Sequence, residues 1–149
     1  MTNDIARMHR RYVPWLSVLF CLFVFRVAAQ LTQKFFNLSF LPPFADWYSG
    51  AVSYGLLLSS QILIILVFCW VLLGFARMAI LPRRRLGRWL LAFGAVYFSV
   101  MAVRLIAGLS FAADHPWLGA SIPAFFHIVL ASSVLLVGHF HFTYGKRAS

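Results

Sequence analysis

Four long apolar stretches dominate the chain, and each is close to the ~20 residues that a helix needs to cross a bilayer. The short segments between them hold most of the charged residues. No part of the chain has the alternating apolar and polar pattern of a membrane β-barrel. The pattern therefore predicts an all-α integral membrane protein, a single four-helix transmembrane domain over residues 1–149, with helices at about 13–33, 51–78, 89–111 and 122–142.

Composition agrees with a lipid environment. Hydrophobic residues make up 62% of the chain and charged residues 11%, and a water-soluble domain of this size could not bury so much apolar surface. The net charge of +10 would suggest a nucleic-acid partner in a soluble protein, but here the basic residues form short clusters between apolar stretches. Such clusters are typical of membrane topology and lipid headgroup contact. We therefore expect membrane lipid as a partner and no nucleic acid.

The distribution of Lys and Arg predicts the orientation. Basic residues concentrate before the first apolar stretch, between the second and third, and after the fourth, whereas Lys34 is the one basic residue of the opposite loops. The positive-inside rule then places both termini and the middle loop in the cytoplasm. We expect a multi-pass protein of the plasma membrane, the inner membrane in a bacterium. The basic residues that decide the orientation are Arg7, Arg10, Arg11, Arg77, Arg83, Arg84, Arg85, Arg88, Lys146 and Arg147.

The loop at residues 34–50 is apolar and aromatic. Pro42 and Pro43 bar a regular helix there. We expect the loop to lie on the outer membrane surface or to pack over the helix ends, and docking of a partner is a further hypothesis. Four tryptophans fall at predicted membrane edges, as in an interfacial aromatic belt. They are Trp15 and Trp89 on the cytoplasmic side, and Trp47 and Trp117 on the outer side.

Two short matches suggest an internal duplication. The segment RVAAQL at 26–31 resembles RLIAGL at 104–109, and FADW at 44–47 resembles FAADHPW at 111–117. Each unit would be a helix, an outer loop and a second helix, so the hypothesis is a two-helix parallel repeat about an axis along the membrane normal.

Two arginines lie inside the predicted spans. Arg26 and Arg104 fall about 20 Å and 22 Å from the cytoplasmic start of their stretches, at 1.5 Å per residue, so both lie in the outer half. An arginine at such a position costs about 2.5–3.5 kcal/mol. One interpretation is that they snorkel to the outer headgroups, and the other is that they face inward and hold an anionic group. Gln30 follows Arg26 by four residues and shares its helix face.

The chain offers these arginines few acidic partners, since Asp4, Asp46 and Asp114 are its only acids. Asp46 and Asp114 are predicted on the outer side, so pairs of Arg26 with Asp114 or of Arg104 with Asp46 are open. No acid lies within the spans, which disfavours a cation pump or a proton-driven exporter. A site for an anion remains open.

Histidines give a weaker signal. His127 and His141 in the fourth stretch are 14 residues apart, about four turns, and so project from roughly the same face. Haem-binding membrane helices have similar spacing, but no other predicted span carries matching histidines, and two ligands alone are weak evidence for a metal. Haem is therefore a minor hypothesis.

No nucleophile–base–acid set, phosphate-binding glycine loop or HExxH motif occurs in the sequence, and we expect no enzyme activity. The first functional hypothesis is a small non-catalytic inner-membrane subunit or assembly factor of a larger membrane complex. The second is a small transporter or a lipid- or anion-binding membrane protein, acting as a homo-oligomer. A haem- or quinone-linked redox subunit is a weaker third. The residues expected to bind the ligand or partner are Arg26, Arg104, Gln30, Asp46 and Asp114.

Overall fold

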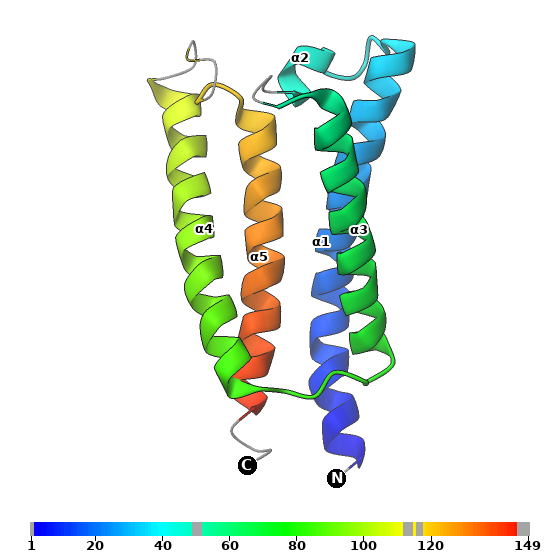
Figure 1. Ribbon diagram of the computed structural model, residues 1–149, viewed down its shortest axis with the longest axis vertical. Helices are drawn as coiled ribbons and strands as arrows, with labels where there is room; N and C mark the ends of the chain where they lie inside the picture. The colour runs from blue at the N-terminus through cyan, green and yellow to red at the C-terminus, as the bar shows by residue number, and fades with distance from the viewer. Residues whose placement is uncertain (1, 49–51, 112–114, 116–117, 146–149) are drawn as a thin grey trace.

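The computed structural model describes the chain except residues 1, 49–51, 112–114, 116–117 and 146–149, and the side chains of residues 2–5. The described part is helical and contains no strand, and four of its helices are long and apolar enough to cross a membrane (Figure 1). This confirms the helical architecture expected from the sequence. The helices are α1 (Thr2–Phe36), α2 (Phe44–Trp47), α3 (Tyr54–Ala76), α4 (Arg84–Ser110) and α5 (Ser121–Tyr144).

The helix ends differ from the predicted spans where polar residues continue a helix. Helix α1 begins eleven residues before the predicted start at residue 13, passes through Pro14, and is 35 residues long. At 1.5 Å per residue it measures about 52 Å, well beyond the ~30 Å of a hydrocarbon core. Helix α4 likewise begins at Arg84, inside the basic segment. An apolar stretch indicates which part of a helix lies in lipid, but it does not indicate where the helix ends. Arginine is itself a good helix former, so a helix can continue into a basic segment.

The long helices form two pairs. Helix α1 packs on α3, α4 packs extensively on α5, and the pairs meet through α1 and α5. Helices α3 and α4 do not contact each other anywhere along their described lengths. Figure 1 shows α1 beginning and α5 ending at one end of the bundle, the termini end, and α2 at the other, the α2 end. The pairing is compatible with a duplicated helix hairpin, which stays a prediction.

Small residues set the close contact between α4 and α5. A Cβ added at Gly87 would lie 2.3 Å from the backbone nitrogen of Phe142, and one at Gly138 would lie 3.0 Å from the Cβ of Leu90. Backbones can approach this closely only where side chains are absent or small. On the facing sides of the two helices the small residues are spaced by seven positions, except on α4 between Gly94 and Gly108, where Met101 interrupts the series. They are Gly87, Gly94 and Gly108 on α4, and Ala124, Ala131, Gly138 and Gly145 at α5 and its end.

Aromatic residues join three helices at the termini end. Phe75 of α3 and Phe140 of α5 are fully buried, with their ring centroids 4.7 Å apart in an edge-to-face contact. Tyr12 of α1 packs on Phe140 at 5.4 Å, and its hydroxyl shares a 2.7 Å hydrogen bond with Nδ1 of His139. This cluster fixes α1, α3 and α5 together.

The first loop packs over the helix ends, one of the two placements expected from the sequence. Pro43 directly precedes the four-residue helix α2, so the expectation that the prolines bar a helix here was wrong: proline is well suited to a helix start. Trp47 was also misplaced in the interfacial belt, because it is only 4% exposed and its ring stacks on Phe126. Trp15 and Trp89 are exposed as a belt requires, and Trp117 lies outside the described residues.

Candidate functional site

Arg26 lies inside the bundle on the face of α1 that meets α5. Only 5% of the residue is exposed, and its Cζ lies 5.6 Å from the centroid of the Phe126 ring. The guanidinium forms no hydrogen bond or ion pair with any described residue, and Nε is fully buried. A buried charge normally has a partner, so this guanidinium is an uncompensated donor group.

Two further polar side chains lie beside Arg26. The hydroxyl of Tyr97 on α4 and Nδ1 of His127 on α5 share a 2.6 Å hydrogen bond. The charge of Arg26 acts on both groups, and the charge of Arg104 acts on His127 as well. Three helices therefore bring two arginines, a phenol and an imidazole into one polar cluster, the Arg26 cluster.

Arg104 enters this cluster from α4. It is 5% exposed, like Arg26, so neither side chain lies on the outer surface of the bundle as snorkelling would require. Gly108 lies one turn further along the same face, and a Cβ there would fall 2.2 Å from the carbonyl oxygen of Leu118. The absence of a side chain at Gly108 thus lets the chain before α5 cross directly over Arg104's helix.

Buried glutamines extend the polar region toward α2 and α3. The amide of Gln61 on α3 donates to Oε1 of Gln30 on α1 at 3.0 Å, and Gln30 donates in turn to the carbonyl of Trp47 at 3.3 Å. Oε1 of Gln61 is buried with no partner among the described residues. Spacing from Arg26 identified Gln30 in advance but not Gln61 as part of the site. The signal in the sequence was that Gln61 is the one amide side chain of α3, whose other residues are mostly apolar.

Asp46 does not complete the cluster as expected. Asp46 is exposed on α2, which packs on α1 and α5 rather than on α4, and it forms no ion pair with a described residue. The predicted pairing of Asp46 with Arg104 is therefore not formed. Asp114, the other expected partner, lies outside the described residues. Arg26 thus has no acid beside it in the described part of the bundle.

The two histidines suggested for metal or haem lie at different ends. His127 belongs to the Arg26 cluster, whereas Nδ1 of His141 accepts a 3.1 Å hydrogen bond from the backbone N–H of Arg83 near the termini end. No three His, Cys, Asp or Glu side chains gather anywhere in the described ranges. Both histidines thus already hold hydrogen-bond partners within the chain.

Comparison with protein-family models, with curated proteins and with solved structures found no match to this chain. The functional assignment therefore rests on the geometry of the site. Guanidinium, phenol and imidazole groups supply hydrogen-bond donors and positive charge, which are the groups that recognise carboxylates and phosphates.

Proposed function

We propose that this chain is a multi-pass membrane protein that binds a carboxylate- or phosphate-bearing ligand at the Arg26 cluster, without transforming it. The observation that carries the proposal is the buried guanidinium of Arg26, which has no hydrogen-bonding or acidic partner among the described residues. Tyr97 and His127 lie beside it as additional polar groups.

Energetics support a ligand at this position. An arginine in the middle of a membrane span costs about 2.5–3.5 kcal/mol, and the contact with Phe126 offsets only part of this. An oxyanion would accept hydrogen bonds from the planar guanidinium and neutralise its charge. The four candidate spans contain no acidic residue, which fits an anion rather than a cation as ligand.

The same proposal includes a membrane orientation. With both termini in the cytoplasm of the plasma membrane, or a bacterial inner membrane, the Arg26 cluster lies in the outer half of the bilayer. Single cysteines at Ser39 and Arg85, introduced after replacement of Cys21 and Cys69 by alanine, test this in intact cells. A membrane-impermeant maleimide should label Ser39→Cys directly and Arg85→Cys only after permeabilisation; the reverse pattern would overturn the orientation.

Ligand binding is tested by thermal unfolding of the purified protein in a neutral detergent. Sodium phosphate and sodium acetate, titrated at constant ionic strength, should raise the Tm of the wild type. A ligand at one hundred times its Kd stabilises by about 2.7 kcal/mol. Arg26→Met should abolish the shift, whereas Arg7→Met, which removes an exposed charge from the same helix, should retain it. If neither anion shifts the wild-type Tm, or if Arg26→Met responds like wild type, the proposed site is wrong.

A second candidate, a subunit or assembly factor of a larger membrane complex, is favoured by a different observation. Helix α3 packs along α1 and meets α5 through Phe75 at the termini end, which leaves Leu56, Ile62 and Leu66 exposed. Purification from the native membrane in mild detergent tests this candidate. Stoichiometric co-purification of another membrane protein would favour it, and a homo-oligomer alone would count against it.

A further inference from the structure

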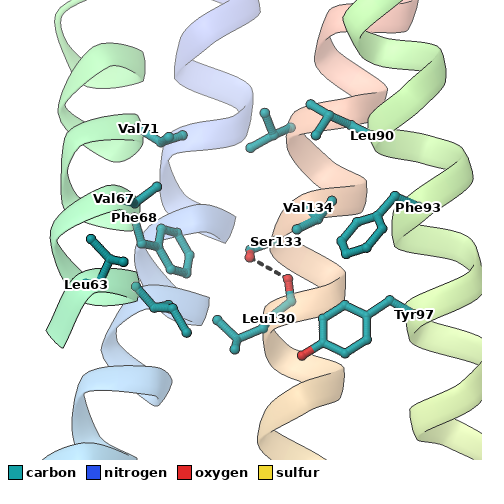
Figure 2. A pocket seen from close by; sticks show the side chains of 12 residues that line it. Leu63, Val67, Phe68, Val71, Leu90, Phe93, Tyr97, Leu130, Ser133 and Val134 are labelled. Carbon is teal, nitrogen blue, oxygen red and sulfur yellow. Dashed lines mark hydrogen bonds between the residues drawn. The ribbon is translucent and has the colours of Figure 1, made fainter. Parts of the chain in front are cut away.

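A groove lies between α3 and α4, and α5 forms its floor. Figure 2 shows Val67 and Phe68 of α3 on one side of this groove and Phe93 of α4 on the other, with Val134 of α5 between them. Its volume is about 550 Å³. The groove exists because α3 packs on α1 and α4 packs on α5, so that nothing in the described chain closes the space between the two pairs.

The lining of the groove is suited to a hydrocarbon chain. Its polar side chains, Ser133 and Tyr97, already have partners: the Ser133 hydroxyl donates to the carbonyl of Leu130 at 2.6 Å, and the Tyr97 hydroxyl is bonded to His127. The remaining lining side chains are aliphatic or aromatic. The groove therefore offers no hydrogen-bonding group to a polar ligand.

Toward the termini end the groove continues into a second cavity of about 680 Å³. The two cavities share Val71, Leu90 and Val137 in their linings, so they adjoin each other, and together they are called the channel. The second cavity is lined by Arg77 and Arg83, which form no ion pair with a described residue, and none of its described lining residues is acidic. One end of the channel is thus apolar and the other positively charged.

The basic end of the channel is built on an anchored loop. His9 of α1 donates from Nε2 to the carbonyl of Ile80 at 3.0 Å, and His141 of α5 accepts from the backbone N–H of Arg83. These contacts tie the loop between α3 and α4 to two other helices. The backbone between Arg77 and Arg83 is therefore anchored, which restricts the positions that the two arginine side chains can reach.

The start of α4 adds a further preference for an anion. Its first turn contains Arg84 and Arg85, no acid, and no side-chain hydrogen bond from the cap residue Arg83. The N-terminus of a helix carries partial positive charge, so basic residues there are unfavourable unless an anion compensates them. A phosphate group at this position would satisfy both the arginines and the helix end.

We propose that this channel binds an anionic phospholipid, with its phosphate at Arg77 and Arg83 and one acyl chain in the groove between α3 and α4. From Leu86 to Tyr97 the channel follows α4 for about 16 Å at 1.5 Å per residue, about half of the ~30 Å hydrocarbon core. The length thus matches one leaflet. The predicted orientation places the basic end in the cytoplasmic leaflet, which is the leaflet rich in anionic lipid. The apolar end of this lipid site shares Tyr97 with the Arg26 cluster, but its headgroup end at Arg77 and Arg83 is separate, and the proposal does not depend on a ligand at Arg26.

Native mass spectrometry of the full-length protein in a neutral detergent tests the headgroup end. Phosphatidylglycerol and phosphatidylcholine with identical acyl chains are titrated separately, and the wild type should bind one phosphatidylglycerol in preference. The double variant Arg77→Gln/Arg83→Gln should weaken this binding by about thirty-fold, since each arginine beside an anionic headgroup contributes about fivefold. The matched control Arg10→Gln/Arg11→Gln, which removes two exposed charges at the same end of the bundle, should bind as the wild type does.

A second pair of variants tests the acyl chain. Val67 is 53% exposed and lines the groove, so Val67→Trp should fill it without disturbing the packing of α3 and reduce phosphatidylglycerol binding at least tenfold. Leu66, the next residue, is 62% exposed and does not line the groove, so Leu66→Trp should have no effect. Equal binding of the two lipids, or equal losses in each variant and its control, would refute the site. Co-purification of a partner helix that excludes the lipid would overturn it as well.

Discussion

Replacing Arg26 by methionine should stabilise the protein when no anion is bound. The substitution removes a buried guanidinium that has no hydrogen-bond partner among the described residues, and it keeps an unbranched side chain that fills a similar space. Relief of the arginine's cost in the span returns about 2.5–3.5 kcal/mol. Loss of the contact with Phe126 costs about 0.5–2 kcal/mol. The difference between these two ranges is about 0.5–3 kcal/mol. Near the centre of that range, the free energy of unfolding should rise by about 1–2 kcal/mol, in line with replacements of other buried charges by apolar residues.

Thermal unfolding followed by far-ultraviolet circular dichroism measures this effect in a neutral detergent without phosphate or carboxylate buffers. A gain of this size corresponds to about 3–6 °C in Tm for a chain of this length. Arg26→Lys, which keeps the charge, should show no such gain, and Arg7→Met controls for the loss of one positive charge. A lower Tm for Arg26→Met than for wild type would refute the reasoning, because the guanidinium would then be a structural group rather than a binding group held at a cost to stability.

Three other substitutions test the packing directly. Gly87→Ala should cost about 1–3 kcal/mol of stability because its Cβ would meet the backbone of α5, whereas Gly55→Ala, which has no atom within 4 Å of the added Cβ, should be neutral or stabilising. Gln61→Leu should cost about 1–3 kcal/mol of stability, because it leaves the buried Oε1 of Gln30 without its donor. Adding Gln30→Leu should recover part of that loss. Strictly additive changes of the two substitutions in the free energy of unfolding would contradict the contact. His141→Ala should accelerate trypsin cleavage of the loop between α3 and α4 several-fold, and unchanged cleavage would show that this histidine does not anchor the loop.

The arginines illustrate how far sequence reasoning reached toward the site. Depth could be counted along each helix, so Arg26 and Arg104 were expected at similar levels, and Gln30 followed from its spacing of four. Counting residues along a helix does not determine how that helix is rotated about its own axis in the bundle. Whether the guanidiniums face lipid or the bundle depends on which face of α1 meets α5, and that is a property of packing.

Other parts of the site required the tertiary structure altogether. Tyr97 and His127 are thirty residues apart in the chain, and only the contact between α4 and α5 brings them within hydrogen-bonding distance. Trp47 carries the sequence features of an interfacial tryptophan. In the structure, however, its side chain at the end of α2 is buried and stacks on Phe126.

Apolar patterning and charge placement in the sequence were sufficient to determine four helices and a predicted orientation, because each depends on the local chemistry of single segments. The arrangement of the helix pairs was decided only in three dimensions. It leaves α3 and α4 apart, opens the groove between them, and buries Arg26, because pairing depends on how whole helix surfaces fit and not on any one segment.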